Sequence, residues 1–231
     1  MKKAFILAAV LALTLTGCRF IRVGNAEDWE FNMVRGSENL VTETMDLGPF
    51  DGVSLAISAD VYYREVSDTP TVTVTAPDNI FEYFDFTVDK GVLKIRYKKD
   101  VKVVHNADIT VVLAAPTLRK VTVAGSGSFV AEAPIVTGSF DASVAGSGDL
   151  SIAVLTAGEV NLAVAGSGDM RVRELSCDEL SAAIAGSGDM TLAGKAGKAD
   201  LGVSGSGDMN VRSLESNEMK TSVAGSGEIL K

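Results

Sequence analysis

The chain has 231 residues and an acidic balance, with 30 Asp and Glu residues against 21 Lys and Arg residues. An acidic chain lacks the basic footprint that nucleic-acid phosphates require, so nucleic acid is excluded as a partner. One histidine and two cysteines are too few for a zinc site built from His and Cys ligands.

Residues 1–17 have the layout of a cleavable signal peptide. Lys2 and Lys3 form a basic start, and the apolar run over residues 4–15 is too short to span a bilayer comfortably. The run ends in Leu15-Thr16-Gly17-Cys18, which resembles the lipobox of bacterial lipoproteins. The resemblance implies cleavage before Cys18 and lipid attachment to its sulfur. The alternative is a plain secretory or transmembrane segment with an accidental cysteine.

The mature chain is therefore expected to be tethered to the membrane through Cys18. Arg19 follows the cysteine and resembles outer-membrane sorting in enterobacteria. We expect a cell-envelope protein that is lipid-anchored at the outer membrane, facing either the periplasm or the cell surface. Residues 18–45 are polar and weakly periodic, which predicts a tether. With Cys18 lipidated, Cys177 has no partner for a disulfide and is interpreted as a small packing residue rather than a reactive thiol.

Residues 46–124 alternate between apolar and polar side chains without a clean repeat. The pattern is clearest in Thr71-Val72-Thr73-Val74-Thr75 and in Val92-Leu93-Lys94-Ile95-Arg96-Tyr97. Period-two alternation predicts strands, and Pro70, Pro77 and Pro116 punctuate them. We expect this part to be an irregular first half of the folded domain, which spans residues 46–231.

Residues 125–231 contain a repeat marked by the tripeptide Gly-Ser-Gly. The six copies begin at Gly125, Gly146, Gly166, Gly186, Gly205 and Gly225, 19 to 21 residues apart. Apolar residues alternate after each tripeptide and again before the next one, which predicts at least two short strands per unit, joined by tight turns.

A unit of about 20 residues cannot bury its apolar face alone, but stacked units can line up equivalent side chains inside a coil. The fold class we predict is all-β: a single-stranded, right-handed β-helix-like solenoid. The coil should be narrow, because Phe140 is the last aromatic residue of the chain.

The combination of a lipobox, strands opening at Phe50-Asp51-Gly52-Val53, and Val-Ala-Gly-Ser-Gly repeats resembles a known family. It is similar to the bacterial family called putative auto-transporter adhesin, head GIN domain, over roughly residues 46–228. The resemblance implies a β-helix-like fold exported to the envelope. It brings no catalytic motif.

An acidic residue follows most copies of the tripeptide. These acids occupy one place in consecutive units and are Asp149, Asp169, Asp189, Asp208 and Glu228. Stacking would bring like charges to about 5 Å, where repulsion is about 1 kcal/mol in water and larger in drier surroundings. Calcium could offset the repulsion and is the one cofactor the pattern suggests. Alternatively, each acid accepts hydrogen bonds from turn N–H groups and stays in water.

Catalysis has weak support in the sequence. Gly-Ser-Gly is not the Gly-x-Ser-x-Gly elbow of hydrolases, and a Ser-His-Asp triad would have to use His105. A lyase or hydrolase acting on glycans is the main alternative, because acids are plentiful and such enzymes occur on β-helices.

The predicted function is a non-catalytic surface for adhesion or envelope organisation, with a glycan or an envelope protein as partner. The basic run that includes Lys94, Arg96, Lys98, Lys99 and Lys102 could contact an anionic ligand, or form the solvated face of a strand. Tyr62, Tyr63 and Tyr83 could stack on sugars, or be ordinary half-buried strand residues. No polar capping segment follows the last coil, so either Glu228 and Lys231 suffice to cover it or it docks on another copy, which would give a homo-oligomer.

Overall fold

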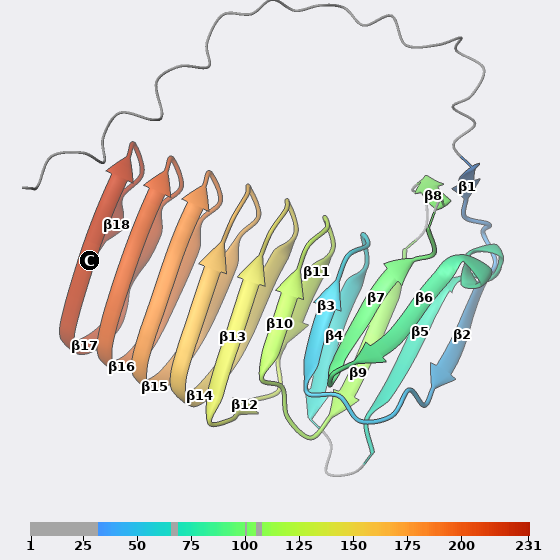
Figure 1. Cartoon of the computed structure of the whole chain (residues 1–231), viewed down its shortest axis with the longest axis horizontal. Helices are drawn as coiled ribbons and strands as arrows, with labels where there is room; N and C mark the ends of the chain where they lie inside the picture. Colours follow the sequence, from blue (N-terminus) through green and yellow to red (C-terminus); the bar gives the residue numbers. More distant parts are fainter. Residues whose placement is uncertain (1–31, 66–68, 100, 105–107) are drawn as a thin grey trace, which may run out of the picture. The chain divides into compact units, whose positions relative to one another are not determined.

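The computed structural model describes residues 32–65, 69–99, 101–104 and 108–231. Cys18, Arg19, His105 and the signal segment therefore lie outside the described residues. Strands dominate, and successive coils of about 20 residues build a β-solenoid of about 6 turns (Figure 1). The predicted all-β solenoid is confirmed.

The regular half is built from long strands that bend. β14 (Asp149–Val164), β15 (Met170–Gly186), β16 (Met190–Gly205) and β17 (Met209–Gly225) each run almost a full coil. All pairings between these coils are parallel and nearly in register. The expectation of two short strands per unit was wrong, because pairing continues through the bend, as in Leu155 with Leu175. Only the Gly-Ser-Gly end of each coil is a tight turn.

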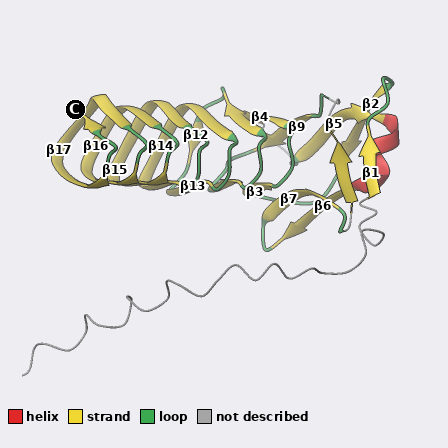
Figure 2. Cartoon of the chain, turned by 90° about the horizontal axis from the view of Figure 1, so that it is seen from above, coloured by secondary structure: helices red, strands yellow, loops and turns green. Residues whose placement is uncertain are grey.

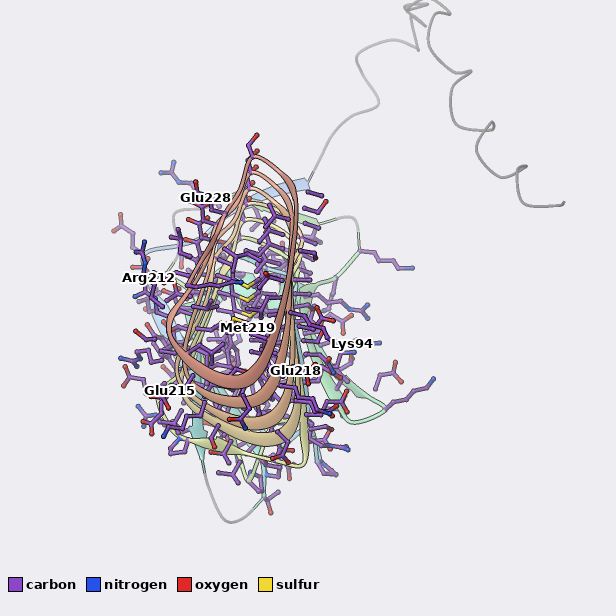
Figure 3. The ribbon with its side chains drawn as sticks, turned by 90° about the vertical axis from the view of Figure 1, so that its left-hand side faces the viewer. Lys94, Arg212, Glu215, Glu218, Met219 and Glu228 are labelled. Atoms are coloured by element: carbon purple, nitrogen blue, oxygen red, sulfur yellow. The ribbon has the colours of Figure 1, made fainter. Side chains whose placement is uncertain are left out.

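Two flat faces result, which we call face A and face B. Face A contains the first halves of the long strands, and face B contains their second halves after the bend. Viewed along the stack, each coil is a flattened loop with a narrow end and a rounded end (Figure 3). Arg212 lies on face A, Glu218 lies on face B and Glu228 lies at the narrow end.

The irregular half continues both faces with shorter strands (Figure 2). On face A the spatial order is β2 (Leu40–Met45), β5 (Thr71–Pro77), β9 (Thr110–Ala115), β4 (Asp60–Glu65), β11 (Ser128–Ala131) and then β14. On face B it is β6 (Phe84–Asp89), β7 (Val92–Tyr97), β3 (Gly52–Leu55), β10 (Lys120–Val123), β13 (Ser139–Val144) and then β14.

The remaining elements are short. β1 (Asn32–Arg35) pairs in parallel with β8 (Val101–Val104). The others are the 3₁₀ helix η1 (Asp78–Tyr83), β12 (Ile135–Val136) and β18 (Ile229–Leu230).

Coils do not stack in chain order in this half. The coil of β3 and β4 lies between the coil of β7 and β9 and the coil of β10 and β11. The chain thus builds a middle coil first, adds the outer coil, and then crosses to the other side.

The folded domain begins earlier than residue 46. β2 lies within the segment predicted as a tether and pairs antiparallel with β5, and hydroxyl groups of Thr42 and Thr75 lie 2.8 Å apart across this pair. β5 pairs antiparallel with β9, so two antiparallel strands cover the first parallel coil of face A. The tether expectation was wrong for residues 40–45.

The core is a set of apolar ladders. Met170, Met190 and Met209 stack behind Leu150, and each side chain is at most 1% exposed. No charged or polar residue is buried among the described residues. Burial of this kind supplies the main stabilisation of the coil.

The tight turns require glycine because coils approach closely there. A Cβ on Gly168 would lie 1.9 Å from the carbonyl oxygen of Gly148 in the preceding coil. The first turn of the series, Ile57-Ser58-Ala59, has no glycine. The requirement is therefore set by contact with the preceding turn and not by the turn alone.

Gly194 explains the one 19-residue spacing. It occupies the ladder position of Leu175 and Leu214, next to shifts of register, with a φ of 123°. A Cβ there would lie 2.1 Å from the carbonyl oxygen of Leu175. Glycine lets this coil take a shorter path without breaking the stack.

Candidate functional site

The repeated acids form a row at the narrow end of the solenoid, which we call the acid ladder: Asp149, Asp169, Asp189, Asp208 and Glu228. All five residues are exposed. They are held in line because each follows the Gly-Ser-Gly turn of its own coil, and the turns stack in register.

The four aspartates of the ladder each accept a hydrogen bond from the next coil through a carboxylate oxygen. The backbone N–H of Asp169 donates to Oδ1 of Asp149 at 3.0 Å, and that of Asp189 donates to Oδ1 of Asp169 at 2.9 Å. The N–H groups of Asp208 and Glu228 donate to the preceding acids at 2.8 Å. Hydrogen bonds to a carboxylate are about twice as strong as neutral ones, so they offset part of the repulsion between stacked charges.

The ladder begins before the repeats. Asp60 is in register with Ser128, whose hydroxyl donates to its Oδ1 at 2.6 Å, and Ser128 is in register with Asp149. Sequence reasoning missed Asp60. The signal was present, because Ala56-Ile57-Ser58-Ala59-Asp60 has the Ala-x-Ser-x-Asp pattern of the repeats with its glycines replaced.

No three acidic, histidine or cysteine side chains gather as a potential metal site in the part of the chain that the structure describes. The ladder residues stand one per coil, and four of them use Oδ1 for a backbone hydrogen bond. This arrangement favours the alternative to calcium, in which the acids accept backbone hydrogen bonds and stay in water.

Face B carries rows of charge over the regular half. A shallow pocket of about 240 Å³ lies there, and its polar lining includes Glu159, Glu179, Lys198, Asp200 and Glu218. Lys198 pairs with Glu179 at 3.5 Å, and all these side chains belong to the second halves of successive strands. Exposed ion pairs of this kind contribute little to stability. Their main effect is on which charged partners can approach face B.

The basic residues of the run that lie on β7 are both paired with acidic residues of β6. Lys94 pairs with Asp89 at 2.7 Å and Arg96 pairs with Asp85 at 2.8 Å, both across the hairpin with β6. Lys98 donates to the carbonyl oxygen of Glu82. These contacts favour the interpretation as a solvated strand face.

Cys177 lies half-buried at the rounded end of its coil. Burial, with a smaller contribution from the charge of Asp178, raises the pKa of the thiol to about 11. A raised pKa disfavours the thiolate, which is the reactive form, so Cys177 is poorly suited to nucleophilic chemistry. It stacks in register with Ala157 and Ala196, as a packing residue would.

The three tyrosines considered as sugar-stacking residues lie in different surroundings. Tyr63 is buried and donates its hydroxyl to the carbonyl oxygen of Ala115 at 3.1 Å, whereas Tyr62, the next residue of β4, points outward and is 40% exposed. Tyr83 lies in η1, away from β4. A second pocket, of about 380 Å³, lies beside Tyr62 on face A.

Together, the stacked coils, the two flat faces and the ladder define a β-solenoid that offers extended surfaces. The only helix in the described part of the chain is η1, and it is far from the length of a membrane-spanning helix.

The chain belongs to the family described as putative auto-transporter adhesin, head GIN domain, which matches it over residues 49–173 and 152–230. No curated protein matches it.

Several solved structures share the fold. A putative adhesin from Parabacteroides merdae ATCC 43184 is 21% identical, with a TM-score of 0.73 over 87% of this chain and 100% of that one. A putative adhesin from Parabacteroides distasonis ATCC 8503 is 22% identical, with a TM-score of 0.73 over 85% and 98%. A structure from the same organism that is named a putative lipid binding protein is 21% identical, with a TM-score of 0.70 over 86% and 100%.

Proposed function

We propose that this chain is an envelope lipoprotein, anchored through Cys18, whose solenoid presents a non-catalytic, adhesin-like binding surface. The observation that carries the proposal is the rigid repetition of outward-facing rows on two flat faces. The backbone of a hydrogen-bonded sheet is already ordered, so binding costs the protein less conformational entropy than binding to loops would.

The chemistry of the described residues supports binding over catalysis. The ladder acids are exposed to solvent and four of them accept a backbone hydrogen bond, whereas a general acid is usually held in a secluded site. The names of the related solved structures point the same way, since they are a putative adhesin from each of two Parabacteroides species and a putative lipid binding protein.

The proposal is tested by protease treatment of intact cells that express the full chain with an epitope tag after Lys231. We expect the tag to be lost from intact cells, because an adhesin must face outward. Lysed cells and a known periplasmic protein are the controls. Survival of the tag on intact cells would contradict adhesion and favour a scaffold facing the periplasm.

A matched variant tests the anchor. Cys18→Ser removes the sulfur that would carry the lipid, so labelled palmitate should be incorporated by the wild-type chain and not by the variant. Equal labelling of both chains would contradict anchoring at Cys18.

A further inference from the structure

Tyr62 is an exposed aromatic side chain in the middle of a flat parallel sheet. Among the residues the structure describes, it is the one aromatic residue with more than a third of its surface exposed. The backbone at Tyr62 is held in place by the next residue, because Tyr63 is buried in the core and its hydroxyl donates to the carbonyl oxygen of Ala115 of β9. β4 is also paired on both edges, with β9 and with β11.

Valine residues flank Tyr62 on both neighbouring strands. Val112 of β9 and Val130 of β11 are its register partners, and both side chains point outward and are half-buried. Adjacent strands are roughly 4.8 Å apart, so the three side chains form one apolar strip about 10 Å wide. We call this strip the Tyr62 platform.

Polar groups border the platform. Arg64 follows two residues along β4, Glu132 follows Val130 in the same sense, and Thr110 precedes Val112. All three, with the platform residues, line the 380 Å³ pocket. Arg64 forms no ion pair with a described residue. The border thus offers guanidinium donors, a carboxylate acceptor and a hydroxyl, with one positive and one negative charge.

This combination fits a sugar ring better than other ligands. A pyranose has an apolar C–H face that stacks on an aromatic ring, and hydroxyl groups at its edge that both donate and accept. An acyl chain requires an enclosed apolar cavity, but this pocket is open and has a charged border. Because the border charges cancel, a neutral sugar is favoured over an anionic one.

We propose that the Tyr62 platform binds a sugar ring of a neutral glycan, with Tyr62 as the stacking residue and Arg64 and Glu132 as hydrogen-bonding residues. This inference rests on the proposed binding function and names its ligand class. Tyrosine is suited to the role because it supplies a rigid amphipathic contact at low entropic cost.

The test uses the full chain, purified in detergent, with five defined neutral hexasaccharides: β-1,4-glucan, α-1,4-glucan, β-1,4-xylan, β-1,4-mannan and chitin oligomers. Binding is measured by isothermal titration calorimetry. We expect at least one oligosaccharide to bind. Tyr62→Ala should weaken that binding by about tenfold or more, the equivalent of about 1.4 kcal/mol. Tyr62→Phe should stay within about twofold, because stacking needs the ring and not the hydroxyl.

Two further variants sharpen the test. Tyr83→Ala removes a tyrosine away from the platform and should leave binding unchanged. Arg64→Met keeps the length of the side chain, removes its donors and should weaken binding even if Tyr62→Ala fails to fold, which circular dichroism would reveal.

Three results would overturn the inference: no binding of any oligosaccharide, equal binding by the wild type and the Tyr62→Ala or Arg64→Met variant, or Tyr62-dependent binding of phosphatidylcholine vesicles in place of glycans. None of these results bears on display at the cell surface, so the proposed function and this inference fail separately.

Discussion

Gly188→Ala is the sharpest test of how the coils stack. Gly188 ends the tight turn between β15 and β16, and a Cβ on it would lie 2.0 Å from the carbonyl oxygen of Gly168. Real Cβ contacts essentially never fall below 3.0 Å, so the two coils would have to separate by about 1 Å or more.

The cost follows from the hydrogen bonds that cross this contact. The N–H groups of Ser187 and Gly188 donate to the carbonyl oxygen of Gly166 at 2.8 and 3.1 Å, and that of Asp189 donates to Asp169 at 2.9 Å. At roughly 0.5–1.5 kcal/mol each, the loss of these three bonds lowers the free energy of unfolding by about 1.5–4.5 kcal/mol. For a folded part of this size, the melting temperature should fall by roughly 3–18 °C.

A control lies on the next coil. A Cβ on Gly202 would meet only the hydroxyl oxygen of Ser222, at an ordinary 3.4 Å, and its register partner on β15 is Ala183. Gly202→Ala should therefore leave the free energy of unfolding unchanged or raise it by about 0.4–1 kcal/mol. The melting temperature should accordingly stay the same or rise slightly. Both variants are measured by thermal circular dichroism. A Gly188→Ala protein that melts within about 1 °C of the wild type would refute close stacking at the turns, since even the lower estimate predicts more.

Two further outcomes are expected. Calcium at millimolar concentration, added after chelation, should leave the melting temperature unchanged, because the ladder acids stand one per coil and Oδ1 of four of them already accepts a backbone hydrogen bond. A rise that follows the logarithm of calcium concentration would show that the ladder holds the ion. Cys177 should react slowly with iodoacetamide at pH 8, because a pKa of about 11 leaves roughly one thiol in a thousand ionised. The rate of labelling should climb as the pH rises towards that pKa. Labelling is measured by mass spectrometry, with urea-unfolded protein as the reference. Rapid labelling of the folded protein at pH 8 would contradict burial of the thiol.

The regular half could be predicted from sequence because local pattern and tertiary contact coincide there. Residues one repeat apart, such as Leu162 and Ala182, are also neighbours in space. The irregular half breaks this rule. β3 pairs with β7 and with β10, and neither pairing follows from a spacing visible in the chain. β2 lies in the segment predicted as a tether because that segment is polar and only weakly periodic. Its pairing with β5 is antiparallel, and no repeat in the chain marks it.

The acid ladder, too, could be predicted from the sequence only in part. The positions of the ladder acids could be read from the repeat, but their hydrogen bonds could not, because each joins a carboxylate to the N–H of the following coil. The alignment of each carboxylate with that N–H group depends on how the turns stack, and the alternation of apolar and polar residues does not encode it. The Tyr62 platform was still less accessible. Val112 and Val130 stand 50 and 68 residues beyond Tyr62. Val130 is its neighbour only because the coil of β10 and β11 stacks on the coil of β3 and β4 out of chain order.

That non-sequential order also has a consequence for binding. Where successive repeats stack, each outward row carries similar side chains, and the surface can offer a ligand the same contact at every coil. Where coils from distant segments meet, a row can place unlike residues side by side, as it does with the valines around Tyr62. A specific pocket needs such unlike neighbours, since one ring must meet an apolar floor and a polar border at once. The irregular half is therefore where this solenoid can best discriminate between ligands, and the regular half extends the rigid sheet that holds the pocket in shape.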